Sequence, residues 1–127
     1  MIILQQIDAN IINPKIIIID NVINMLDYND KILIFKILSE FRDNGGIVIN
    51  FTNDVEESIY FDRIIIIYDK KLICDGNTIS VLNEEKILKR LGIGLPFHVE
   101  LSKYLMDYGV INKYYLSDEK LVNAIWK

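Results

Sequence analysis

Residues 14–27 read Pro-Lys-Ile-Ile-Ile-Ile-Asp-Asn-Val-Ile-Asn-Met-Leu-Asp, and this stretch decides the fold class. A run of isoleucines ends abruptly at Asp20, and a second acid, Asp27, follows seven residues later. A continuous β-branched run is typical of a strand covered on both faces, as in parallel sheets. A carboxylate at the end of such a strand is how nucleotide-hydrolysing sheets present a magnesium-directing Asp. The next residue is the amide Asn21, where hydrolysis would want a carboxylate base.

The flanking segments alternate between strand and helix patterns. We expect strands at 15–19, 47–51 and 63–68, with a short strand at 72–74 after a hairpin connection and a turn at Asp75-Gly76. A helix is expected at 29–42, with Asn29 as its N-cap, a stop at Gly45-Gly46 and a buried stripe of Ile34, Ile37, Leu38 and Phe41. This order predicts an α/β fold with a parallel sheet and right-handed crossovers.

Polar residues follow two of the predicted strands. Asp20 and Asn21 follow the first, and Thr52, Asn53 and Asp54 follow the second. Ligands of parallel sheets bind beyond the carboxyl ends of the strands, so we expect these residues to converge on one site. Asn53 and Glu56 also have the spacing of a capping box for a short helix.

The C-terminal third reads as helical. Residues 78–91 predict one or two helical pieces with a break at 83–85, and 97–108 and 117–126 predict two amphipathic helices. Two glycines and a proline within residues 92–96 mark the clearest boundary. We therefore expect an α/β core over 1–92 and a helical extension over 93–127.

Composition excludes several classes of protein. The 127 residues carry a net charge of -4 and show no Lys/Arg stripe, which argues against a nucleic-acid partner. No apolar run approaches the length of a membrane-spanning helix, so we expect no direct membrane insertion. The single cysteine, Cys74, cannot form an internal disulfide, and with no signal-peptide pattern we expect a cytoplasmic protein.

Five motifs in order resemble the second half of an ABC-type transporter ATPase. Residues 14–20 are similar to the Walker B strand, Leu26-Asp27 to the D-loop, 52–54 to the switch-histidine loop, 61–64 to the "ADR" strand and Asp75-Gly76 to the glycine turn. Residues 91–96, followed by Glu100-Leu101, are similar to the extension of energy-coupling-factor ATPases, which drive cobalt, nickel and vitamin uptake. The resemblance covers about residues 9–110.

The resemblance implies a role for each position. In intact relatives ATP is the cofactor, and the residue matching Asp20 holds the Mg²⁺ ion between its β- and γ-phosphates. Asp27 and Asp54 match further nucleotide-site positions. The position of Asn21 is normally the Glu that polarises the attacking water, and that of Asn53 is normally a His contacting the γ-phosphate. Both catalytic positions therefore hold a residue that cannot exchange protons near neutral pH.

Two family motifs do not occur in these residues. There is no phosphate-binding G-x-x-x-x-G-K-S/T loop and no Leu-Ser-Gly-Gly-Gln signature; residues 2–13 match only the tail of the helix that follows the signature. In the family the phosphate-loop strand lies between the strands matching 47–51 and 63–68. Without it, these two strands pair directly, another polypeptide fills the slot, or two strand edges stay exposed.

The function expected from this resemblance is that of a truncated, degenerate ATP-binding subunit of an energy-coupling-factor importer. We expect it to be inactive alone, to bind no cofactor alone, and to act by pairing with another ABC ATPase chain, and through it with a transmembrane subunit, at the inner face of the membrane. The alternatives are a standalone α/β interaction module or a receiver-like domain that uses Asp20 as phosphoacceptor. The second is disfavoured because a receiver also needs an earlier acidic pair and a later Lys.

Overall fold

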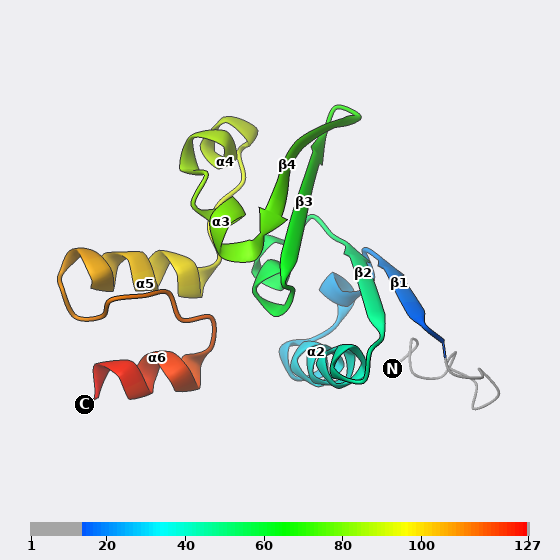
Figure 1. Cartoon of the computed structure of the whole chain (residues 1–127), viewed down its shortest axis with the longest axis horizontal. Coiled ribbons are helices and arrows are strands. Elements are labelled where there is room, and N and C mark those ends of the chain that lie inside the picture. The colour runs from blue at the N-terminus through cyan, green and yellow to red at the C-terminus, as the bar shows by residue number, and fades with distance from the viewer. Residues whose placement is uncertain (1–13, 127) are drawn as a thin grey trace. The chain divides into compact units, whose positions relative to one another are not determined.

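The computed structural model describes residues 14–126, which form two compact units (Figure 1). The first unit ends at Asp54 and the second begins at Val55. The prediction that residues 2–13 match the end of a helix concerns residues outside the described range. The expected boundary between residues 92 and 93 stays a prediction.

The first unit is built on two parallel strands. β1 (Ile16–Asp20) pairs with β2 (Ile47–Phe51) in the register Ile16 to Ile47 through Asp20 to Phe51. The short 3-10 helix η1 (Ile23–Met25) and α2 (Tyr28–Asp43) connect them. The buried apolar residues of this unit are Ile19, Ile23, Ile34, Phe35 and Leu38. The α/β class, the parallel pair and the crossover helix are therefore confirmed.

Two details of α2 differ from expectation. The helix is capped by Asp27, whose carboxylate accepts the N–H of Asp30 at 3.0 Å, and not by Asn29. Asp27 is the N-cap because its backbone is extended and because its carboxylate lies at the positive end of the helix dipole. In the predicted stripe Ile37 is exposed, and Phe35 is buried in its place. Phe41 is only half-buried and lies against Gly46, where a Cβ would overlap its ring.

The second unit contains an antiparallel hairpin. After η2 (Val55–Tyr60), β3 (Arg63–Tyr68) pairs with β4 (Lys71–Asn77). The connection is Asp69-Lys70, with φ of 48° and 60°, as a type I′ turn requires.

The expected turn at Asp75-Gly76 is wrong, because both residues lie within β4, opposite Ile65 and Ile64. Asp75 there forms a two-point ion pair with Arg63, at 2.7 Å and 2.8 Å, which extends the ladder.

Four helices complete this unit. They are α3 (Thr78–Leu82), α4 (Glu85–Leu91), α5 (Phe97–Asp107) and α6 (Asp118–Ile125). The break between α3 and α4 and the two C-terminal helices are confirmed. Gly92 ends α4 with a left-handed φ of 70°.

The described strands form two separate two-stranded sheets, β1–β2 and β3–β4. Each sheet lies within one unit, and how the edges of strands 47–51 and 63–68 are paired stays a prediction. None of the helices within residues 14–126 combines the length and apolar content that crossing a membrane requires.

Candidate functional site

The candidate site lies at the carboxyl ends of β1 and β2, within the first unit. Asp20 and Phe51 are register partners, and the N–H of Asn21 donates to the carbonyl of Phe51 at 2.7 Å. The two chain segments that leave the strands therefore start side by side. The backbone thus brings Asp20 and Asn21 next to the start of the segment 52–54, as the parallel pattern predicts.

Asn21 has a backbone conformation that sequence reasoning did not anticipate. Its φ is 52°, in the left-handed region, which Asn tolerates better than most residues other than Gly. Its side-chain Oδ1 accepts a hydrogen bond from Asn24 Nδ2 at 2.9 Å. The amide that the sequence resemblance matches to the family's catalytic Glu is thus engaged with a neighbouring side chain of the same loop.

Asp20 supplies one exposed carboxylate, which makes no hydrogen bond or ion pair with any residue of 14–126. Within that range no group of three or more His, Cys, Asp and Glu side chains could hold a metal ion. Mg²⁺ is commonly bound by one or two carboxylates together with phosphate oxygens and water. Asp20 therefore fits a Mg²⁺ ion that arrives with a nucleotide, and does not form a complete site by itself.

The other two acids have structural partners. Asp27 caps α2, as described above. Asp54 is half-buried, and its Oδ2 lies 3.3 Å from Nζ of Lys31, which extends from α2. Sequence reasoning missed Lys31, because no local pattern signals a pair of residues that are 23 positions apart.

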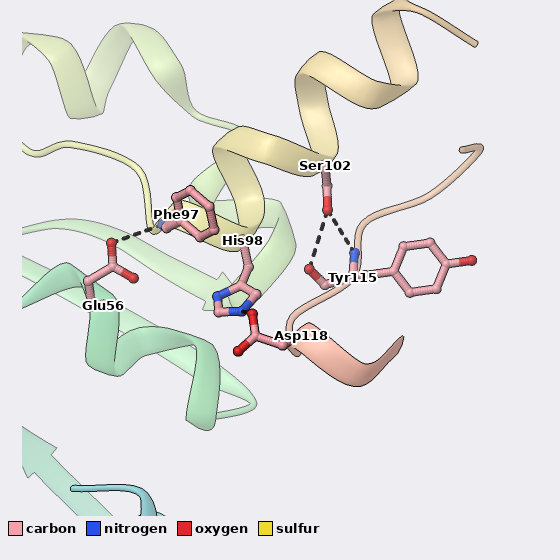
Figure 2. Close-up of polar contacts among 6 residues, drawn as sticks. All are labelled: Glu56, Phe97, His98, Ser102, Tyr115 and Asp118. Carbon is pink, nitrogen blue, oxygen red and sulfur yellow. Dashed lines mark hydrogen bonds and ion pairs between the residues drawn. The ribbon is translucent and has the colours of Figure 1, made fainter. Parts of the chain in front are cut away.

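Asn53, which the sequence resemblance matches to the switch position, is exposed. The predicted capping box between Asn53 and Glu56 stays a prediction. The hydroxyl of Thr52 accepts the N–H of Asp54 at 3.0 Å, while Oε1 of Glu56 accepts the N–H of Phe97 at 2.9 Å. Glu56 is therefore used at the beginning of α5, where a carboxylate also suits the helix dipole (Figure 2).

In the second unit, polar contacts hold the two C-terminal helices together (Figure 2). Nε2 of His98 on α5 lies 2.8 Å from Oδ1 of Asp118 on α6. The fully buried Ser102 hydroxyl accepts the N–H of Tyr115 at 3.1 Å and donates to its carbonyl at 3.3 Å. These contacts order the segment between the helices.

Comparison with known proteins shows which proteins share this pattern. No family model matches the chain. The chain is 30% identical over 118 residues to the energy-coupling factor transporter ATP-binding protein EcfA1 of Lactobacillus delbrueckii subsp. bulgaricus, and 31% identical over 115 residues to EcfA1 of Bacillus subtilis. These alignments cover 91% and 89% of the chain. Its homologues are energy-coupling factor transporter ATP-binding proteins. The resemblance inferred from the ordered motifs is confirmed.

The alignments cover only 42% of the Lactobacillus EcfA1 and 41% of the Bacillus EcfA1, so the chain spans less than half of these relatives. A solved structure with the same fold is CbiO1 from Clostridium perfringens, described as part of the ABC transporter complex CbiONQ. The match has a TM-score of 0.51 at 23% identity and covers 74% of this chain and 37% of CbiO1. The ABC ATPase fold is thus shown, which argues against the receiver-like alternative.

Proposed function

We propose that this chain is a degenerate part of an energy-coupling-factor ATP-binding subunit that does not hydrolyse ATP alone and acts by pairing with another ABC ATPase chain in substrate uptake. Asn21 carries this proposal. Homology to EcfA1 proteins and the Walker B pattern of β1 support the family, while the amide after Asp20 argues against hydrolysis by this site.

The chemistry of Asn21 is the main argument for inactivity. An amide does not accept a proton near neutral pH, and loss of a general base typically costs about 10²- to 10⁴-fold in rate. The Oδ1 atom that could orient a water instead accepts a hydrogen bond from Asn24. Asn53 can donate a hydrogen bond to a phosphate, but it lacks the proton exchange of an imidazole.

The remaining acids suit a role in binding. We propose that Asp20 directs a Mg²⁺ ion that comes with ATP held mainly by the partner chain. Asp27 then supports the D-loop by capping α2, and Asp54 positions the switch segment through its ion pair with Lys31. When bound, the ion would neutralise negative charge on the phosphate groups of the nucleotide.

The proposed partner is another ABC ATPase chain and, through it, a transmembrane transport subunit. The description of CbiO1 as part of a transporter complex supports such an assembly in general terms. The chain would then lie on the cytoplasmic side and associate peripherally with the inner face of the membrane.

Two measurements test the proposal. We expect no ATP turnover by the purified chain in a phosphate-release assay with Mg²⁺, and a specific complex when the chain is co-expressed with the full-length Bacillus subtilis EcfA1. Magnesium-dependent hydrolysis that Asp20→Ala abolishes would overturn the inactive assignment. Failure to form any complex with full-length EcfA1 would remove the pairing role.

A further inference from the structure

The dipeptide Asn44-Gly45 lies at the end of α2, and it is the one Asn-Gly dipeptide in the sequence. Asn is among the residues that degrade most readily in proteins. The usual reaction is an attack by the backbone nitrogen of the next residue on the side-chain amide carbon, and a glycine, which has no Cβ, obstructs that attack least. Both residues are exposed, so water can reach them. This position therefore has the residue types and the access that spontaneous deamidation requires.

We propose that Asn44 is a site of spontaneous deamidation that the folded end of α2 keeps unreactive. In the reaction a bond forms between the Gly45 nitrogen and Cγ of Asn44, the Cγ–Nδ2 bond breaks, and ammonia leaves with the proton of the Gly45 N–H. Water then opens the resulting succinimide ring at either carbonyl, which leaves aspartate or isoaspartate at position 44. Water is the co-reactant, and no group is oxidised or reduced.

Two hydrogen bonds hold the reacting groups in place. The side-chain Nδ2 of Asn44, which is the leaving group, donates to the carbonyl of Glu40 at 2.8 Å. The N–H of Gly45, which carries the attacking nitrogen, donates to the carbonyl of Arg42 at 2.8 Å. Both reacting groups are therefore bonded to the last turn of α2 in the folded chain.

The backbone of Asn44 also keeps these groups apart. Its ψ is 15°, so the Gly45 nitrogen nearly eclipses the backbone nitrogen of Asn44. Ring closure requires the Gly45 nitrogen to lie near Cβ instead, because Cβ carries the carbon that is attacked. Asn44 must therefore rotate out of its helix-end conformation, and both hydrogen bonds must break, before the ring can close. Local openings of this kind occur in folded proteins and are easiest at the ends of elements.

The product weakens the helix end on which it forms. Aspartate at position 44 has no side-chain N–H to donate to Glu40, and it places a negative charge at the negative end of the helix dipole, directly after Asp43. Isoaspartate adds a methylene group to the main chain, which displaces the N–H of Gly45 from its acceptor. Each conversion therefore favours the open form of this helix end.

The test follows modification of the purified full chain at mildly alkaline pH, with and without urea. Peptide mapping by mass spectrometry detects the mass increase that replacement of NH2 by OH gives, and chromatography separates aspartate from isoaspartate. We expect Asn44 to convert about tenfold or more slowly in the folded chain than in urea, because breaking two hydrogen bonds lowers the population of the reactive form by at least this factor.

Asn83 is the matched control within the same chain. It is an exposed C-cap, of α3, with φ of -81° and ψ of -10°, and the residue after it is Glu84. Its conformation is similar to that of Asn44, but the side chain of Glu84 obstructs the attacking nitrogen. Asn83 should therefore convert more slowly than Asn44 in urea.

A core substitution tests the protection separately. Leu38→Ala removes a buried side chain of α2 and should raise the rate at Asn44 several-fold without urea, up to the rate in urea if the variant does not fold. Leu33→Ala, at a 49% exposed position of the same helix, is its control and should convert like the unchanged chain. In urea all three chains should convert at the same rate, since the dipeptide is the same.

The site is refuted if Asn44 stays unmodified in urea, or if Asn83 converts there as fast as Asn44. The protective role of the helix end is refuted if a chain that is folded by circular dichroism converts as fast without urea as with it, or if Leu38→Ala leaves the rate without urea unchanged. Asn44→Asp should speed hydrogen exchange in the last turn of α2, and unchanged exchange would refute the weakening by the product.

Discussion

The left-handed backbone at Asn21 leads to a prediction about which side chains position 21 accepts. We consider the substitutions Asn21→Gly, Asn21→Ala and Asn21→Glu. A residue with a Cβ other than Asn or Asp costs roughly 1–2 kcal/mol at a φ of 52°. Each substitution also loses the exposed hydrogen bond from Asn24, which is worth about 0.5–1 kcal/mol.

We therefore expect Asn21→Ala and Asn21→Glu to destabilise the first unit by about 1.5–3 kcal/mol. Asn21→Gly should cost about 1–2 kcal/mol, because Gly adopts this φ without strain but loses the same hydrogen bond and makes the unfolded chain more flexible. The consequence for function is that Asn21→Glu alone restores no ATP hydrolysis, since the carboxylate is placed on a backbone that disfavours it.

The assay is hydrogen exchange followed by mass spectrometry on peptides from residues 14–54, since these report the first unit separately from the second. Asn24→Ala is the control that removes the hydrogen bond and leaves the backbone at position 21 unchanged. If Asn21→Ala exchanges as slowly as the unchanged chain, or if Asn21→Gly is less protected than Asn21→Ala, the reasoning from backbone strain is refuted.

Three further predictions concern local contacts. Asp27→Ala should destabilise α2 by about 1 kcal/mol while Asp27→Asn keeps most of the cap, as urea unfolding followed by far-UV circular dichroism would show. Gly46→Ala should cost about 1–3 kcal/mol through overlap with the ring of Phe41, and Phe41→Leu in the same chain should recover part of it. The hydrogen bond from Arg63 lowers the pKa of Asp75 in the folded chain. The pair therefore stabilises the β3–β4 hairpin fully at pH values above the unfolded-state pKa of about 3.9. This stabilisation is lost as the pH falls through the lower pKa of the folded state. Acid titration of hairpin amide shifts by NMR should show this loss, and Asp75→Asn should abolish it.

The elements that could be predicted from sequence are those with strong local patterns. The isoleucine run of β1, the helix between two strands and the break before α4 were each set by side-chain periodicity or by residues that cap or end a helix. The incorrect predictions concern polar residues near the ends of elements, at the N-cap of α2 and at the end of β4. Asp27 and not Asn29 caps α2, and Asp75 continues β4, where Ile65 is its register partner and Arg63 forms an ion pair with its carboxylate.

The site was only partly predictable. The parallel register, inferred from the β-branched runs, places Asp20 and Asn21 beside the end of β2. The ion pair of Lys31 with Asp54 could not be predicted, because it joins residues brought together only when α2 packs near the strand ends.

The sequence by itself determined the order of the ATPase motifs, the carboxylate of Asp20 and the amide of Asn21, because these are properties of residue type and spacing. Only the tertiary structure decided that the backbone of Asn21 is in the left-handed region and that its side chain accepts a hydrogen bond from Asn24. The tertiary structure also decided that one face of the β1–β2 sheet has exposed apolar side chains. The physical reason is that backbone conformation in a loop and exposure of a sheet face depend on which segments pack together, and local sequence patterns do not encode that choice.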